Sequence, residues 1–252
     1  MEYFFQTERL CVGYNGKSVI ENIEITLKKG QILTVIGPNG SGKSTILKSV
    51  AKQLKTIGGV IRIGGNSASD IKARELSRLM ALVLTERPKP ERMTCGDVVA
   101  VGRYPYTGIL GALSAADKAK IDGALKAAGA FDIKDCNFME VSDGQLQRIM
   151  LARAICQEPE IIVLDEPTSF LDIRSAVEIL DILRQMASEQ SVTVIMSLHE
   201  LIYAKRVSDL AMCVKDGLVL HFDIPEVIFT KEIISRLYDL PDNTYEQLFG
   251  GF

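Results

Sequence analysis

The chain has 252 residues, of which 47% are hydrophobic and 24% are charged, and its formal net charge at pH 7 is −3. This length allows a sizeable core in one domain or two lobes, and this composition excludes a largely disordered chain. The small negative charge predicts no general attraction to nucleic acid or to anionic lipid.

The same sequence excludes several other classes of protein. No apolar run approaches the roughly eighteen residues that a membrane-spanning helix needs, so we expect a cytosolic chain. The five cysteines include no CxxC pair, which favours reduced thiols over a metal site or a disulfide framework. His199 and His221 are the only histidines, and we expect no His-rich metal site.

From the N-terminus, two strand-like runs at 3–10 and 19–27 predict an antiparallel sheet. Gly13-Tyr14-Asn15-Gly16 lies between them and predicts a turn. The ring of Tyr14 in this turn is placed to stack on a nucleotide base; the alternative is that it only covers the core.

The central stretch of the chain is Gly37-Pro38-Asn39-Gly40-Ser41-Gly42-Lys43-Ser44-Thr45. A short apolar run precedes it and apolar residues at helical spacing follow it, as a glycine-rich phosphate loop requires. The glycines let successive backbone N–H groups point at phosphate oxygens. Lys43 would reach the outer phosphates of a nucleoside triphosphate, and Ser44 would offer its hydroxyl to Mg²⁺. The alternative is a plain glycine turn between a core strand and a core helix.

Beyond this loop, short strands and a helix continue to about residue 84, and then the pattern changes. Residues 93 to about 140 are rich in Ala and Lys and have helical periodicity, which predicts a helical insertion. After it, helices alternate with the strands 161–164 and 192–197, which predicts a parallel sheet. A hairpin within 210–222 and a small helical tail from Pro225 onward would complete the chain.

Candidate catalytic residues follow these two strands. Asp165 and Glu166 end the strand 161–164, where Asp165 would bind the metal and Glu166 would act as general base on water. His199 follows the strand 192–197 at the carboxyl edge, where ligands of open α/β folds collect, and would contact the γ-phosphate. The alternatives are a solvated strand end for the acids and a hydrogen-bonded core histidine for His199.

A second anion-binding helix terminus is predicted at Ser142-Asp143-Gly144-Gln145, which open a helix. One triphosphate needs only one cradle, so we interpret the second set of donors as contacting nucleotide on another copy of the chain. The sequence therefore predicts a homodimer, head to tail around ATP.

With these motifs in this order, the sequence resembles the ATP-binding cassette ATPases over nearly its whole length. The phosphate loop matches residues 37–45, and the signature, usually LSGGQ, reads Val141-Ser142-Asp143-Gly144-Gln145 here. Asp165 and Glu166 match the second nucleotide motif and its catalytic base. The resemblance makes Tyr14 the adenine-stacking aromatic, His199 the switch histidine and residues 169–172 the loop that spans the dimer.

The resemblance implies a fold and a division of the chain. The fold class is α/β, a P-loop NTPase (RecA-like) with a parallel-sheet core, an antiparallel β subdomain and an inserted α-helical subdomain. Residues 1–86 and 142–252 would form the nucleotide-binding core, and 87–141 the helical insertion that ends at the signature. The family usually has a Gln that senses metal and γ-phosphate at the start of this insertion; Glu86 takes its place here as a metal ligand.

Within the family, residues 93–99 and the segment Gly102-Arg103-Tyr104-Pro105-Tyr106 that follows them are similar to importer ATPases of iron-chelate, haem and vitamin B12 permeases. This similarity implies an ATPase at the cytoplasmic face of the membrane that uses ATP and Mg²⁺ and is held there by permease subunits. A solute-binding protein would be an indirect partner, and no nucleic acid is expected. Residues 86–111 would receive a helix of the permease; the alternative is an ordinary solvent-facing loop.

Two other functions compete with this interpretation. An ATP-operated clamp on nucleic acid or the ribosome would need a long coiled coil or two cassettes in one chain, and this sequence has neither. A P-loop kinase would have no use for the signature at Ser142.

Overall fold

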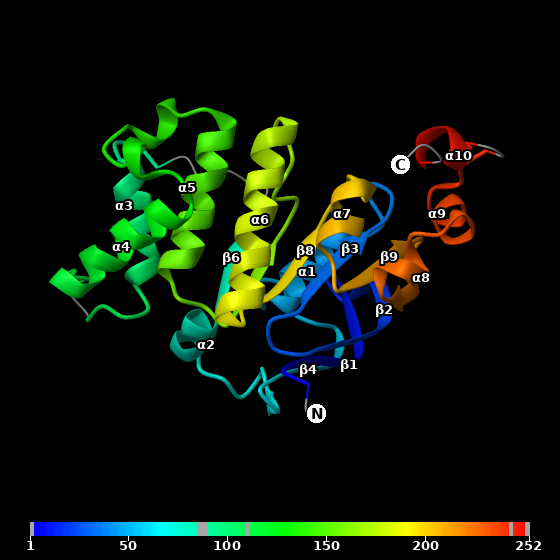
Figure 1. Cartoon of the computed structure of the whole chain (residues 1–252). Helices are drawn as coiled ribbons and strands as arrows, with labels where there is room; N and C mark the ends of the chain where they lie inside the picture. Colours follow the sequence, from blue (N-terminus) through cyan, green and yellow to red (C-terminus); the bar gives the residue numbers. More distant parts are fainter. Residues whose placement is uncertain (1–2, 85–89, 109–110, 242–243, 250–252) are drawn as a thin grey trace. The chain divides into compact units, whose positions relative to one another are not determined.

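The computed structural model describes residues 3–84, 90–108, 111–241 and 244–249 (Figure 1). The chain divides into two compact units, one made of Met1–Asp70 with Ile195–Phe252 and the other of Ile71–Val194. The predicted insertion, 87–141, lies inside the second unit, and its bounds stay a prediction.

An antiparallel sheet forms the N-terminal part of the first unit. Its strands are β1 (Phe5–Tyr14), β2 (Lys17–Leu27), β4 (Gly58–Ile63) and β5 (Asn66–Ser67), in the order β2-β1-β4-β5. The strands β1 and β2 are longer than the sequence pattern predicts, and Tyr14 pairs with Lys17 as the last residue of β1. The predicted turn therefore narrows to Asn15 and Gly16, which both have positive φ.

The first unit also holds the strands that carry the phosphate loop. β3 (Ile32–Ile36) is buried at all five positions, which explains its uninterrupted apolar sequence. It runs parallel to β9 (Leu210–Lys215), and β9 forms the predicted hairpin with β10 (Leu218–Asp223). With the last three residues of β8 (Thr193–Ser197), the strand order in this unit is β10-β9-β3-β8.

Five helices complete the described part of the first unit: α1 (Lys43–Val50), α7 (Leu201–Val207), α8 (Pro225–Ile228), α9 (Lys231–Tyr238) and α10 (Thr244–Phe249). α7 packs on β3, whereas α8 and α9 pack on β9. The predicted helical tail is thus confirmed as α8 to α10, drawn in orange and red in Figure 1, and α9 adjoins the strand next to β3.

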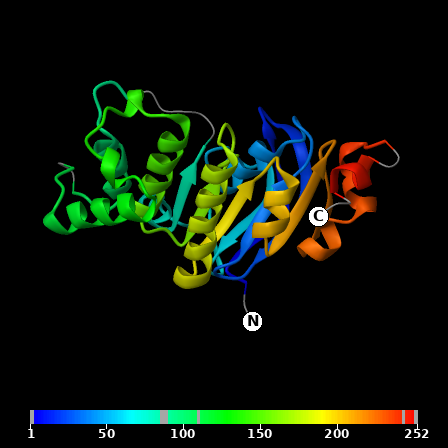
Figure 2. The ribbon, with the colours of Figure 1, turned by 45° about the horizontal axis from the view of Figure 1, so that its top comes forward.

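The second unit combines parallel strands with a group of helices. β6 (Met80–Val83) pairs in parallel with β7 (Ile161–Leu164), as the alternating sequence pattern predicts. The helices are α2 (Ala73–Leu79), α3 (Cys95–Ala100), α4 (Ala115–Ala127), α5 (Asp143–Cys156) and α6 (Ile173–Gln190). Helices α3, α4 and α5 pack on one another, and Figure 2 shows them gathered in one group.

A capping box at Ser114 fixes the start of helix α4. The Ser114 hydroxyl accepts from the Asp117 N–H, and the Asp117 carboxylate accepts from the Ser114 N–H. Apolar periodicity does not detect such polar first turns. In the residues that the structure describes, no helix combines the length and the apolar character needed to span a membrane.

Candidate active site

The phosphate loop, residues 37–45, connects the buried strand β3 to helix α1 in the first unit. Gly42 is the N-cap of α1 and has a φ of 102°, a left-handed conformation that favours glycine. A Cβ atom on Gly42 would lie 2.6 Å from Ile20 Cδ1 of β2, so a larger residue would clash there. The strand, loop and helix that the sequence predicts are all present.

The loop carries polar atoms suited to an anion. Lys43 is 5% exposed, and its Nζ donates to the carbonyl oxygens of Gly37 (2.8 Å) and Pro38 (3.0 Å). Phosphate oxygens are stronger acceptors than neutral carbonyls, so a phosphate group would compete for this ammonium. The buried Ser41 Oγ has no hydrogen-bond partner among the described residues. An unused hydroxyl and an ammonium beside a helix N-terminus fit a polyphosphate.

Two other predicted residues lie beside this loop in the same unit. Thr45 Oγ1 donates to Tyr14 Oη at 3.4 Å, and the Tyr14 side chain is 46% exposed, which keeps its ring available for stacking. The Leu198 N–H donates to the Val35 carbonyl oxygen at 3.3 Å, which places His199 at the end of β3 where the loop begins. The first unit therefore brings together Tyr14, the phosphate loop and His199.

The two acidic residues follow β7 in the second unit, as predicted. Asp165 is 5% exposed, and its N–H donates to the Val83 carbonyl oxygen at 2.9 Å. Glu166 has a φ of 52°, a strained value for a residue with a side chain, and such strain is typical of functional sites. Its Oε2 accepts from Ser169 Oγ at 3.0 Å, so the direction of this carboxylate is fixed.

The signature residues open helix α5, also in the second unit. Ser142 is the N-cap of α5 and forms a capping box with Gln145, whose side chain accepts from the Ser142 N–H at 2.9 Å. Ser142 and Asp143 are exposed. An exposed and capped N-terminus of a 14-residue helix is able to receive an anion from another molecule.

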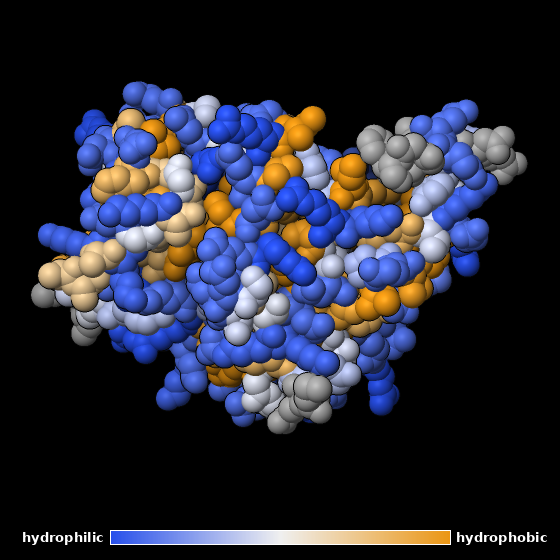
Figure 3. Space-filling model, in the orientation of Figure 1, coloured by the Kyte–Doolittle hydropathy of each residue, from blue (hydrophilic) through white to orange (hydrophobic). Residues whose placement is uncertain are grey.

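Exposed apolar side chains adjoin the start of α6. Phe170 and Ile173 are each 76% exposed, and Phe170 has a φ of 66°. Figure 3 shows hydrophobic surface over the end of α6 where the helix begins. These two residues flank Asp172, the N-cap of α6, whose side chain accepts from the Ser175 N–H at 2.9 Å. The predicted dimer-spanning loop is therefore rigidly capped and presents apolar side chains to solvent.

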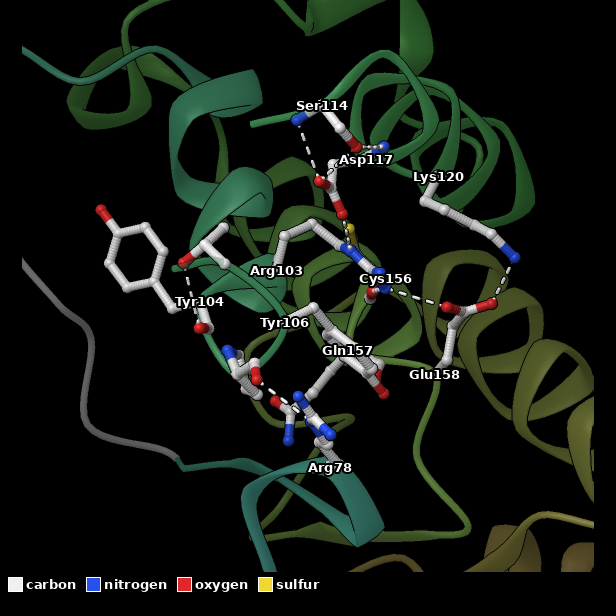
Figure 4. A network of polar contacts seen from close by, with 12 residues as sticks. Arg78, Arg103, Tyr104, Tyr106, Ser114, Asp117, Lys120, Cys156, Gln157 and Glu158 are labelled. Atoms are coloured by element: carbon white, nitrogen blue, oxygen red, sulfur yellow. Dashed lines mark hydrogen bonds and ion pairs between the residues drawn. The ribbon is translucent and has the colours of Figure 1, made fainter. Parts of the chain in front are cut away.

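Only some of the described residues in the predicted permease-facing segment, 86–111, are exposed. Arg103 is 6% exposed, and Figure 4 shows it at the centre of a polar network. Its Nε donates to Asp117 at 2.9 Å, and its Nη1 donates to the Cys156 carbonyl oxygen (2.8 Å) and to Glu158 (2.9 Å). The guanidinium also stacks on Tyr106, 4.0 Å from the ring centroid. Arg103 therefore joins residues 101–107 to α4 and to the end of α5.

The electrostatics of this network favour ionised carboxylates. Hydrogen bonds from Ser114, and then from Arg103, lower the pKa of Asp117 to about 2. Lys120 also pairs with Glu158. Only Tyr104 of the three neighbouring residues Arg103, Tyr104 and Tyr106 projects fully outward, with 60% of its side chain exposed. Tyr106, by contrast, is half-buried, and the Arg103 guanidinium stacks on its ring (Figure 4).

Glu86 lies outside the described residues, so its role stays a prediction.

Motif spacing does not predict residues whose partners lie elsewhere in the chain. The hydroxyl of Tyr238, in the helical tail, is buried and has no hydrogen-bond partner among the described residues, and no pattern in the sequence signals this. Arg103 matched a family segment, but the partners that bury it come from residues 117 and 156–158.

Comparison with known proteins decides the family. A family model described as ABC transporter matches residues 20–169. An uncharacterized ABC transporter ATP-binding protein of Methanocaldococcus jannaschii is 42% identical over 98% of this chain and 85% of its own length. The chain belongs to the ABC transporter family. It is an ATP-binding protein and an ATPase, as its sequence motifs predict.

Other members of the family have more specific names. The iron(3+)-hydroxamate import ATP-binding protein FhuC of Bacillus subtilis is 32% identical over 93% of this chain and 87% of its own length. The ferric enterobactin transport ATP-binding protein FepC of Escherichia coli is 30% identical over 92% of this chain and 86% of its own length.

Solved structures of the family share the fold. A transporter assigned to the metal-chelate type, in an inward-facing conformation, matches with a TM-score of 0.84 and 26% identity over 95% of this chain and 90% of its own. An ATP-binding cassette in a dimeric post-hydrolysis state, with ADP and phosphate, matches with a TM-score of 0.77 and 24% identity over 88% of this chain and 98% of its own, and shows the fold alone. The predicted P-loop NTPase fold class is confirmed.

Proposed function

We propose that this ATPase energises an importer for an iron chelate, haem or a vitamin B12-like solute. The observation that carries the proposal is a phosphate loop with a buried lysine in a chain related, over more than nine-tenths of its length, to import proteins for iron chelates. The inward-facing metal-chelate type transporter supports the same class of solute. The protein would act at the cytoplasmic face of the membrane, held by permease subunits.

Different residues of the chain have different proposed roles in ATP hydrolysis. The loop N–H groups and Lys43 would bind the phosphates, and the exposed ring of Tyr14 would stack on adenine. Glu166, held by Ser169, would accept the proton of the attacking water, and His199 would contact the γ-phosphate. Ser44, Asp165 and Glu86 would hold Mg²⁺, which neutralises phosphate charge when it is bound.

A second copy of the chain is the proposed partner for the signature. The exposed N-cap Ser142 would donate to nucleotide held by the loop of the other copy, in a head-to-tail dimer. The exposed apolar side chains Phe170 and Ile173 support an interface of this kind, because side chains of this size usually become buried when surfaces associate. ATP would then favour the closed dimer, and hydrolysis would remove that preference.

Replacing the proposed base tests the hydrolytic roles. In Glu166→Gln the amide cannot accept the proton of water, so turnover should fall by a factor of about 100 or more while ATP binding persists. ATP-bound dimers should then accumulate, as size-exclusion chromatography would show. Glu189→Gln, at the exposed end of α6, is the matched control and should behave as the wild type. Normal turnover by Glu166→Gln would refute the assignment of the base.

A membrane partner separates the importer from the competing clamp. The protein, purified from detergent-solubilised membranes, should carry a polytopic membrane protein, and Tyr104→Ala should reduce this association because it removes the projecting aromatic. Tyr106→Ala would not be a clean control, since Tyr106 packs on Arg103. Tyr3→Ala, at another exposed tyrosine, serves as the control. Co-purification of nucleic acid or ribosomes without a membrane protein would favour the clamp.

A further inference from the structure

Two helix starts in the second unit carry residues that are proposed to contact a second copy of the chain. Ser142 is the N-cap of α5, and Asp172, in the predicted dimer-spanning loop 169–172, is the N-cap of α6. A Cβ atom on Gly144 would lie 3.5 Å from Ser175 Oγ, so the first turns of α5 and α6 adjoin each other. In the proposed dimer, one partner surface would meet both starts, and their relative position would decide how well it fits.

An ion pair joins the two helices within two turns of these starts. Arg148 of α5 donates through Nη2 to the carboxylate of Glu178 on α6. The side chain of Arg148 is 18% exposed and that of Glu178 is 37% exposed, so solvent screens this pair less than a fully exposed one. Arg148 and Glu178 lie equally far along their helices from the N-caps Ser142 and Asp172. The pair therefore links corresponding points of the two helices.

The guanidinium of Arg148 is itself held in one direction. Its Nη1 donates to the carbonyl oxygen of Ala128, the C-cap of α4, at 3.2 Å. Gly129 has a φ of 63°, and a Cβ atom there would lie 2.9 Å from Arg148 Nη1, so glycine both ends the helix and leaves room for the guanidinium. Because the guanidinium is planar, its contact with Ala128 helps to direct the other nitrogen at Glu178.

Glu178 is shared by two guanidinium groups. Arg174, one turn earlier on α6, donates through Nε to Glu178 Oε1 at 2.9 Å. Hydrogen bonds from Arg174, and then from Arg148, lower the pKa of Glu178, so the carboxylate is charged at physiological pH. The contact with Arg174 stays within one helix, and the Arg174 side chain is 88% exposed. Of these two contacts, that of Arg148 is the one that connects α5 to α6.

We propose that Arg148 and Glu178 are positioning residues, which hold the signature at the start of α5 in register with the dimer-spanning loop at the start of α6. The inference deepens the proposed function and rests on the head-to-tail dimer. The phosphate loop belongs to the first unit, so this pair would not contribute to the binding of ATP by one chain. It would instead govern the closure of the dimer and the hydrolysis that follows closure.

Glu178→Gln tests the proposal with little change in shape. The neutral amide is a weaker partner for the guanidinium, so kcat should fall about five- to tenfold, while the Kd for a fluorescent ATP analogue stays within about twofold of the wild type. Added to Glu166→Gln, it should raise the protein concentration at which ATP-bound dimers form about five- to tenfold, measured by size-exclusion chromatography. Asp122→Asn is the matched control, because it removes the Asp122–Lys134 ion pair, which is similarly exposed and lies in the same unit. Both kcat and dimer formation should be normal in this control.

A double-mutant cycle tests whether the two residues act as one pair. Arg148→Met should also lower kcat, and Arg148→Met combined with Glu178→Gln should be no slower than Arg148→Met alone, because the pair is already broken. Losses that multiply in the double variant would show that the residues act separately and would overturn the proposal.

The remaining outcomes separate positioning from a plain contribution to stability. A lower unfolding temperature in Glu178→Gln with unchanged kcat and dimer formation would overturn the proposal, as would an equal fall of kcat in Asp122→Asn. Ser142→Ala tests the premise: a normal kcat in this variant would overturn the proposed signature contact itself. A loss of kcat in Ser142→Ala together with a normal kcat in Glu178→Gln would overturn the inference about the ion pair alone.

Discussion

Ser142 combines a structural and a proposed functional role in one side chain. Its hydroxyl accepts from the Gln145 N–H and caps α5, while the residue remains exposed to a partner molecule. Replacement of Ser142 by alanine removes both the cap and the proposed contact with nucleotide. A second helix with the same cap is needed to tell the two effects apart, and Ser114 on α4 provides it.

The paired substitutions Ser142→Ala and Ser114→Ala make this separation. Each removes a capping box and should cost about 1 kcal/mol of stability, measured by urea denaturation. Only Ser142→Ala should lower ATPase activity, by a factor of roughly ten to one hundred, because a hydrogen bond to a charged group contributes about 1.5–3 kcal/mol. Equal activities in the two variants would contradict the proposed contact of Ser142 with nucleotide.

At the scale of elements, Arg103 connects three parts of the second unit. Its guanidinium reaches α4 through Asp117 and the end of α5 through Cys156 and Glu158. The exposed Tyr104 is the next residue, so its position depends on a buried anchor. If the helix group receives the permease as proposed, its contact residues need to be held in one geometry, and this network holds Tyr104 in place.

Arg103→Met should therefore destabilise the protein by about 3 kcal/mol, because it leaves Asp117 and Glu158 without their shared guanidinium. Urea denaturation followed by circular dichroism would measure the loss. Arg62→Met removes a solvent-exposed ion pair with Glu8 and should change stability little. Similar losses of stability in both variants would show that the buried ion pairs of Arg103 contribute no more than the exposed pair of Arg62.

The sequence predicts the elements well where local patterns determine them. The apolar run of β7 and the hairpin of β9 and β10 were predicted to within a residue or two, since burial and a two-residue turn control them. The start of α4 and the packing of Tyr106 were not predicted. Both depend on polar contacts: the Ser114–Asp117 capping box and the stacking of Arg103 on the ring.

At the scale of the whole molecule, the dependence of the unfolding free energy on acidic pH tests the network of Arg103, Asp117 and Glu158. The pKa of Asp117 is lowered from its ordinary value of 3.8 to about 2, so the folded state gains stability from the ionised carboxylate above about pH 4. This gain is lost as the pH falls from about 4 to about 2. The difference in unfolding free energy between the wild type and Asp117→Asn should therefore shrink over that interval, measured by urea denaturation at each pH. A constant difference would contradict the lowered pKa.

The motifs of the candidate site could be predicted from the sequence, but the contacts with other elements that hold these motifs in place could not. Motif spacing identified the phosphate loop, Asp165, Glu166 and Ser142, because each stands at the end of a strand or the start of a helix. The hydrogen bonds of Lys215 in β9 to the end of α9 were not identified because the partners lie more than twenty residues apart in the sequence. Contacts of this kind arise from the pairing of β3 with β9 and the packing of α9 on β9, which motif spacing does not encode.

The proposed mechanism requires that two copies of the chain share each site for ATP. A mixture of Lys43→Ala and Ser142→Ala chains tests this claim, because each variant alone lacks one half of every site. In a head-to-tail dimer, the mixed pair contains one intact site, formed by the loop of the Ser142→Ala chain and the signature of the Lys43→Ala chain. If half of the dimers are mixed, ATPase activity should recover to about a quarter of the wild-type rate. No recovery from two separately inactive proteins, under conditions in which mixed dimers form, would contradict the account.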